Sequence, residues 1–73
     1  MSPPIHPTAI IDPEAQIADG VEIGPYAIVE GEVSIASGCR LAAHSVVLRH
    51  SVIEQGVTID SFAVIGGSPQ DLS

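Results

Sequence analysis

Positively charged residues are scarce in this chain, and their scarcity narrows the possible functions. The 73 residues include nine acidic side chains, two arginines and no lysine, which gives a formal net charge of −7. Such a chain does not bind nucleic acid or an anionic membrane surface by general electrostatic attraction. Uninterrupted apolar runs long enough to span a bilayer are also missing, so we expect no membrane insertion.

Cysteine and aromatic residues are almost as rare. The single cysteine, Cys39, cannot form a disulfide within one chain, and we expect a small buried residue there rather than a catalytic one. The near absence of aromatic rings indicates a narrow interior without room for them. The opening residues, Met1-Ser2-Pro3-Pro4, have neither the basic start nor the apolar stretch of a signal peptide, which favours a cytoplasmic location.

What the chain does have is a fixed internal period of six residues. Every sixth residue from the fifth onward is a branched aliphatic, and the residue four places after each of these is small, β-branched or proline. A period of this kind indicates a repeat architecture. The aliphatic series consists of Ile5, Ile11, Ile17, Ile23, Val29, Ile35, Leu41, Val47, Ile53, Ile59 and Ile65.

A six-residue period fits neither an α-helix of 3.6 residues per turn nor one flat strand of period two. It predicts short strands separated by corners, with three hexapeptides forming one triangular coil. Gly20, Gly38 and Gly56 lie 18 residues apart, where a corner needs a positive φ. We therefore predict an all-β parallel β-helix of about three and a half coils of 18 residues. It would form one domain over residues 5–70, with a disordered or extended lead at 1–4 and a short tail at 71–73.

Sorting the outward positions by 18 residues separates the three predicted faces. Two faces carry mainly polar residues, whereas the third carries one exposed aliphatic residue per coil. Beside it runs a corner column that contains both aromatic residues of the chain. A continuous apolar column of this kind is typical of a partner surface. The predicted interface consists of Ile10, Ile28, Val46, Val64, Tyr26, His44 and Phe62.

A β-helix this short has a thin core, and small domains usually need oligomers, metals or disulfides. Self-association is the one of these that fits the composition. We expect a closed homotrimer, because a heterologous patch closes naturally as a ring. The strand edge at the carboxy-terminal end has no proline between Val57 and Ile65, so we also expect trimers to pair end to end into hexamers.

Three segments of the chain carry more information than the six-residue period itself. They are Ile5-His6-Pro7-Thr8-Ala9-Ile10, Ile23-Gly24-Pro25-Tyr26 and Phe62-Ala63-Val64-Ile65-Gly66-Gly67-Ser68-Pro69-Gln70-Asp71-Leu72. These segments resemble UDP-N-acetylglucosamine O-acyltransferase, the first enzyme of lipid A synthesis in Gram-negative bacteria. The hexapeptide pattern is shared by several enzyme families, but the Pro-Gln-Asp-Leu segment that follows Ile-Gly-Gly-Ser is more specific to this family.

This resemblance implies a left-handed, homotrimeric β-helix with active sites in clefts between subunits. The family transfers an R-3-hydroxyacyl chain from acyl carrier protein to the 3-hydroxyl of UDP-N-acetylglucosamine, with a histidine as general base. Gln70 and Asp71 match residues that hold the sugar. The catalytic histidine of the family lies downstream of that segment, so none of His6, His44 and His50 should inherit its role.

Two functions remain open at this point. One is the amino-terminal part of the acyltransferase, which would keep the trimer scaffold and part of the sugar subsite but lack the base and the acyl-carrier-binding region. The other is a minimal self-assembling β-helix without catalytic activity, either a natural short protein or an engineered truncation. We expect no cofactor and no metal site, because the histidines offer no third convergent ligand for zinc.

Overall fold

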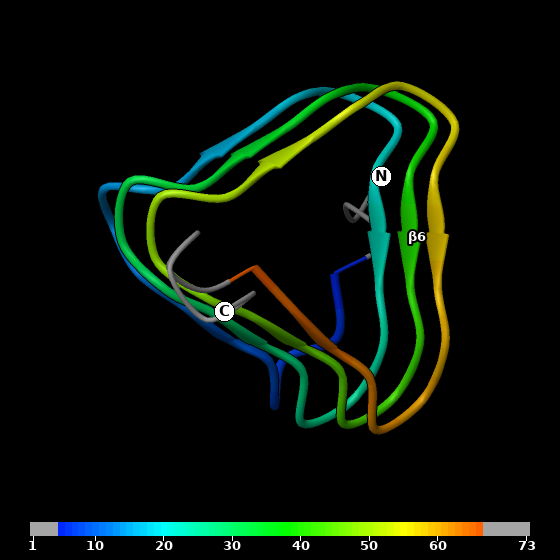
Figure 1. Cartoon of the computed structure of the whole chain (residues 1–73). Coiled ribbons are helices and arrows are strands. Elements are labelled where there is room, and N and C mark those ends of the chain that lie inside the picture. Colours follow the sequence, from blue (N-terminus) through cyan, green and yellow to red (C-terminus); the bar gives the residue numbers. More distant parts are fainter. Residues whose placement is uncertain (1–4, 67–73) are drawn as a thin grey trace, which may run out of the picture.

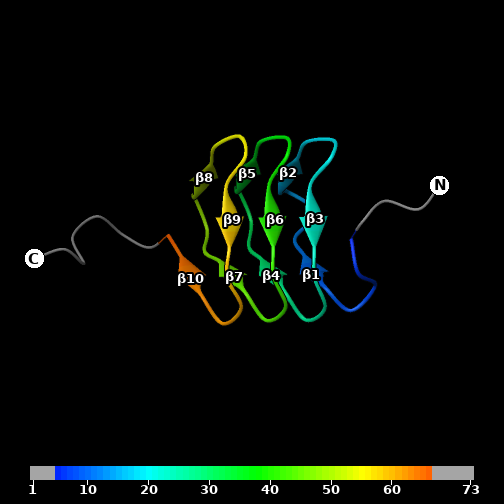
Figure 2. The ribbon, with the colours of Figure 1, turned by 90° about the vertical axis from the view of Figure 1, so that its right-hand side faces the viewer.

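The computed structural model describes residues 5–66, which wind as a three-sided coil of short strands (Figure 1). The predicted lead at 1–4 and tail at 71–73 lie outside this range. The described part contains ten strands of two residues each and no helix. Figure 2 labels all ten: β1 (Ile10–Ile11), β2 (Gln16–Ile17), β3 (Glu22–Ile23), β4 (Ile28–Val29), β5 (Ser34–Ile35), β6 (Arg40–Leu41), β7 (Val46–Val47), β8 (Val52–Ile53), β9 (Thr58–Ile59) and β10 (Val64–Ile65).

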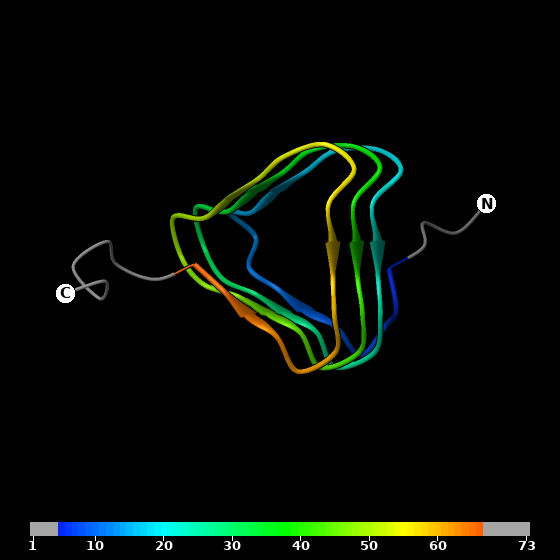
Figure 3. The same cartoon turned by 45° about the vertical axis from the view of Figure 1, so that its right-hand side comes forward.

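Each wall of the coil is one parallel sheet, seen obliquely in Figure 3. Sheet 1 has the order β1-β4-β7-β10, sheet 2 the order β2-β5-β8, and sheet 3 the order β3-β6-β9. Paired residues are 18 apart, as in Ile10 with Ile28 and Glu22 with Arg40. The predicted fold class, a left-handed parallel β-helix of hexapeptide repeats, is therefore confirmed, with about three coils in the described residues.

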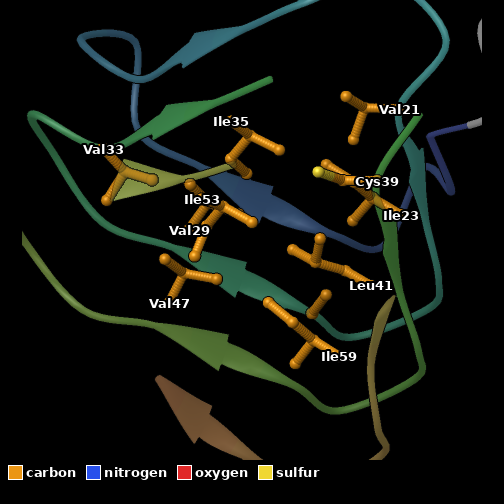
Figure 4. Packing of buried hydrophobic residues seen from close by; sticks show 11 residues of the cluster. Val21, Ile23, Val29, Val33, Ile35, Cys39, Leu41, Val47, Ile53 and Ile59 are labelled. Atoms are coloured by element: carbon orange, nitrogen blue, oxygen red, sulfur yellow. The ribbon is translucent and has the colours of Figure 1, made fainter. Parts of the chain in front are cut away.

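The interior is filled by the two series of the six-residue period, the branched aliphatics and the small residues four places after them. In every strand the first residue points outward and the second points into the prism, so Val29, Leu41 and Val47 are almost completely buried. Figure 4 shows buried side chains of all three walls, such as Val47, Ile53 and Leu41, pointing into the prism. Cys39 is buried at an inward position, as predicted, and its Sγ lies 2.9 Å from the carbonyl oxygen of Glu54. Over residues 5–66 the prism is thus filled by aliphatic and small side chains, and no aromatic ring is among the buried core residues.

The corners explain how the chain turns three times per coil. Gly20, Gly38 and Gly56 have φ values of 80°, 77° and 77°, which confirms the predicted positive φ at this corner. The other two corners reach the same left-handed region without glycine, which the sequence pattern did not predict. The residues concerned are Tyr26, Glu32, His44, His50 and Phe62, with φ between 58° and 69°.

Candidate interface between protomers

Rings are stacked along the corner that joins sheet 3 to sheet 1, which we call the aromatic corner (Thr8, Tyr26, His44 and Phe62). The ring of His44 lies between two others, with its centroid 5.2 Å from that of Tyr26 and 5.1 Å from that of Phe62. The interplanar angles are 16° and 6°, so the three rings are nearly parallel. Stacked rings at this spacing stabilise one another beyond the area that they bury.

Hydrogen bonds from two backbone amides help to hold the aromatic corner in place. The amide of Tyr26 donates to Thr8 Oγ1 at 3.0 Å, and the amide of His44 donates to the carbonyl oxygen of Pro25 at 3.0 Å. Each bond links one coil to the preceding coil. The column of rings forms a ridge along the prism, and these bonds hold it at Tyr26 and His44.

Sheet 1 adjoins this ridge and presents the apolar column that the sequence predicted. Ile10 and Val64 are 66% and 60% exposed, Ile28 is exposed to a lesser degree and Val46 is partly exposed. The strand register places the four residues directly above one another, one per coil. Together with Tyr26 and Phe62, 57% and 76% exposed, they form one continuous apolar surface.

The other two walls differ from sheet 1 in the chemistry of their outward residues. On sheet 3 the guanidinium Nε of Arg40 donates to Glu22 Oε1 at 3.0 Å, and both side chains are exposed. On sheet 2, Gln16 and Ser34 stand beside the exposed Val52, along a shallow depression of about 610 Å³. Only sheet 1 among the three walls described therefore carries an unbroken apolar column.

The three histidines lie in different settings. The ring of His6 contacts Thr8 Oγ1 at 2.8 Å through Nδ1, and His44 is held between two rings. His50 lies on the corner between sheets 1 and 2, which we call the acidic corner (Glu14, Glu32 and His50), and its Nδ1 is 3.0 Å from Glu32 Oε1. The sequence analysis excluded His50 as the catalytic histidine and did not predict this pair. Its 18-residue separation from Glu32 was the signal that could have revealed the pair.

No group of three or more His, Cys, Asp or Glu side chains within residues 5–66 is arranged to hold a metal ion. In the same range no helix is long and apolar enough to cross a membrane. The two residues predicted to hold the sugar, Gln70 and Asp71, lie outside the described residues, so their role stays a prediction. The described geometry therefore provides a docking surface more clearly than a reaction centre.

Comparison with known proteins gives one family match. Residues 5–70 match the family described as GMPPB C-terminal domain, and no curated protein matches. The match concerns the hexapeptide β-helix and its relation to nucleotide-sugar enzymes, and acyl transfer to UDP-N-acetylglucosamine is a narrower hypothesis. Since the match covers nearly all of the chain, the protein belongs to the GMPPB C-terminal domain family, a β-helix family related to nucleotide-sugar enzymes.

Proposed function

We propose that this chain is the assembly scaffold of a UDP-N-acetylglucosamine 3-O-acyltransferase and that it works as a homotrimer. The family match supports a relation to nucleotide-sugar enzymes, and the Pro-Gln-Asp-Leu segment supports this particular substrate. The observation that carries the scaffold role is the apolar surface formed by sheet 1 and the aromatic corner. A monomer would leave that surface in water, whereas self-association would bury it.

The proposed reaction is the transfer of an acyl chain from acyl carrier protein to the 3-hydroxyl of the sugar. The 3-hydroxyl oxygen of the sugar attacks the thioester carbonyl carbon of the acyl carrier protein, and the carrier thiol departs as the ester forms. A general base takes the hydroxyl proton, which finally goes to the leaving thiolate. Gln70 and Asp71 are the proposed sugar contacts, by resemblance to the family.

We assign the general base to none of the three histidines of this chain. His44 is stacked between two rings, and the Nδ1 of His6 is engaged by Thr8. His50 is the one that needs a direct test, because a carboxylate beside an imidazole is an arrangement that can accept a proton. We therefore expect the chain alone to give no turnover, and acyl transfer that disappears in His50→Ala would contradict this assignment.

The substrate proposal is tested by calorimetric titration of the chain with UDP-N-acetylglucosamine, together with its molar mass from light scattering in dilute buffer. We expect a trimer that binds the nucleotide sugar weakly and loses binding in Asp71→Ala. Gln16→Ala, on the outward column of sheet 2, is the matched control and should keep whatever affinity the unmodified chain has. A monomeric mass would contradict the scaffold role, and binding unaffected by Asp71→Ala would contradict the sugar assignment.

A self-assembling β-helix without catalytic or sugar-binding activity is the second candidate. The same apolar surface favours it, because burying that surface needs only further copies of the chain. A trimer that shows no detectable UDP-N-acetylglucosamine binding would support this candidate over the acyltransferase scaffold. The end-to-end pairing of trimers into hexamers and the cytoplasmic location stay predictions.

A further inference from the structure

We propose that the protomers meet through two different surfaces, with the aromatic corner of one copy docked head-on onto sheet 1 of the next. The inference rests on the self-association in the proposed function and adds which surfaces touch. The contact is heterologous, so each protomer uses its ridge on one neighbour and its sheet 1 on the other. Three such contacts close the ring.

The two surfaces match in length and spacing. The ridge has one side chain per coil, and so has the outward column of sheet 1. The ring centroids are 5.1 and 5.2 Å apart, close to the roughly 4.8 Å that separates neighbouring strands in any sheet. A ridge lying parallel to a neighbour's column therefore meets it coil for coil, without slipping out of register.

The triangular cross-section fixes the number of copies (Figure 1). The aromatic corner joins sheets 3 and 1 and so points away from sheet 2, the opposite wall. If this corner presses head-on onto the neighbour's sheet 1, the neighbour is rotated by the angle between the outward directions of sheets 1 and 2. In a three-sided prism that angle is about 120°, so the third copy returns to the first and the ring closes as a trimer.

Docking of the aromatic corner on sheet 2 would leave the assembly open, and docking on sheet 3 would bury a charged pair. A ridge pressed head-on onto sheet 2 requires no rotation between copies, so the assembly would extend as an open row instead of closing. A ridge pressed onto sheet 3 could close a ring but would cover the exposed pair of Glu22 and Arg40 with apolar rings. Removing that pair from water costs free energy that apolar contacts do not return. Sheet 1 alone combines closure with apolar contact.

Cysteine cross-linking between two different variants tests this arrangement. One protein carries His44→Cys on the ridge and the other carries Val46→Cys on sheet 1, and the two are refolded together and mildly oxidised. A disulfide requires the two Cα atoms to approach within about 7 Å, so linked pairs form only where ridge meets face. We expect linked pairs in the mixture and none from either variant alone. The unmodified chain is the background control, because Cys39 is buried.

Each alternative contact has its own signature. Linkage of His44→Cys to itself would indicate ridge against ridge, and linkage to Val52→Cys or Arg40→Cys would indicate docking on sheet 2 or sheet 3. Each of these results would overturn the inference. Tyr26→Cys with Ile28→Cys repeats the test one coil away in case the first pair assembles poorly. A trimeric mass without linkage in either pair overturns the docking mode alone, whereas a monomeric mass of the unmodified chain overturns the proposed scaffold role as well.

Discussion

The aromatic corner and the glycine corner (Gly20, Gly38 and Gly56) solve the same backbone problem with different residues. Both turn the chain through the left-handed region, with φ of 61–64° at Tyr26, His44 and Phe62 and 77–80° at the glycines. A residue with a side chain pays roughly 1–2 kcal/mol for that conformation, and glycine does not. The aromatic corner therefore accepts strain that glycine would remove, and so does the acidic corner at Glu32 and His50. What distinguishes the aromatic corner is that its side chains are stacked rings, two of them largely exposed.

Sheet 1, beside the aromatic corner, and sheet 2, beside the glycine corner, differ in their outward residues but not in their buried ones. Sheets 1 and 2 bury equivalent aliphatic residues, such as Val47 and Ile53, so their interiors contribute similarly to folding. Their outward columns differ, since sheet 1 is aliphatic in every coil and sheet 2 carries Gln16 and Ser34 before Val52. Inward residues thus specify the β-helix, and outward residues specify which part of it is available to a partner.

The largest expected effect comes from placing a charge on sheet 1 with Val46→Asp. In the proposed ring this carboxylate would be buried without a partner, which typically costs several kcal/mol. A loss of only about 2.7 kcal/mol raises a dissociation constant by roughly 100-fold. We expect the assembly to dissociate and, because the core is thin, the protomer to unfold with it. Light scattering measures the first change and circular dichroism the second.

Val52→Asp on sheet 2 is the matched control for that variant. It makes the same chemical change at the outward position of β8, the last described strand of sheet 2, where Val52 is 72% exposed. We expect the assembly to persist, because the new carboxylate stays in water. Equal dissociation by both variants would remove the distinction between the two walls.

A smaller effect is expected from His44→Gly, which makes the aromatic corner resemble the glycine corner. Two stacked pairs worth about 0.5–1.5 kcal/mol each are lost. Relief of the left-handed strain, roughly 1–2 kcal/mol, offsets much of that loss within the protomer. We therefore expect little change in protomer stability but weaker assembly, seen as dissociation at a higher protein concentration. His44→Asn, which tolerates a positive φ, is the control for the ring alone.

Most of the fold could be predicted from the sequence because an 18-residue coil repeats the same physical demand at every corner and strand. The aliphatic series located the inward positions, and the spacing of Gly20, Gly38 and Gly56 located one corner with positive φ. The handedness of the β-helix could not be predicted from the residue spacing. Spacing alone does not reveal it, because either hand would place the same residues inside, and its prediction came from the resemblance to a known family.

Less of the site could be predicted. The apolar column and its corner were found because they are composed of unusual residues for an exposed position. The left-handed conformation of Tyr26 and His44 was missed, since these residues rarely adopt it and the closure of the coil imposes it. Ring stacking and the pair between Glu32 and His50 both follow from 18-residue spacing. They were missed because that spacing was used to sort residues into columns and not to find contacts.

Gly38→Ala tests the glycine corner, and we expect it to lower the stability of the protomer moderately. An added Cβ has room, with the nearest atom 3.8 Å away at the backbone of Gly56, so the cost is the backbone conformation alone. We expect a loss of roughly 1 kcal/mol in the free energy of unfolding, measured by urea denaturation. Gly31→Ala, at a glycine without positive φ and with Asp12 3.4 Å from the added carbon, should be close to neutral.

The smallest effect is expected at the acidic corner with Glu32→Gln, which removes the carboxylate 3.0 Å from the Nδ1 of His50 but preserves side-chain length. Both side chains are largely exposed, so the contact contributes only about 0.2–1 kcal/mol. In buffer acidic enough to protonate the imidazole, the difference in stability between this variant and the unmodified chain should shrink further as salt screens the pair. Urea denaturation at low and high ionic strength measures it. A loss of assembly comparable to that in Val46→Asp would mean that the acidic corner, and not the aromatic corner alone, faces a neighbouring protomer.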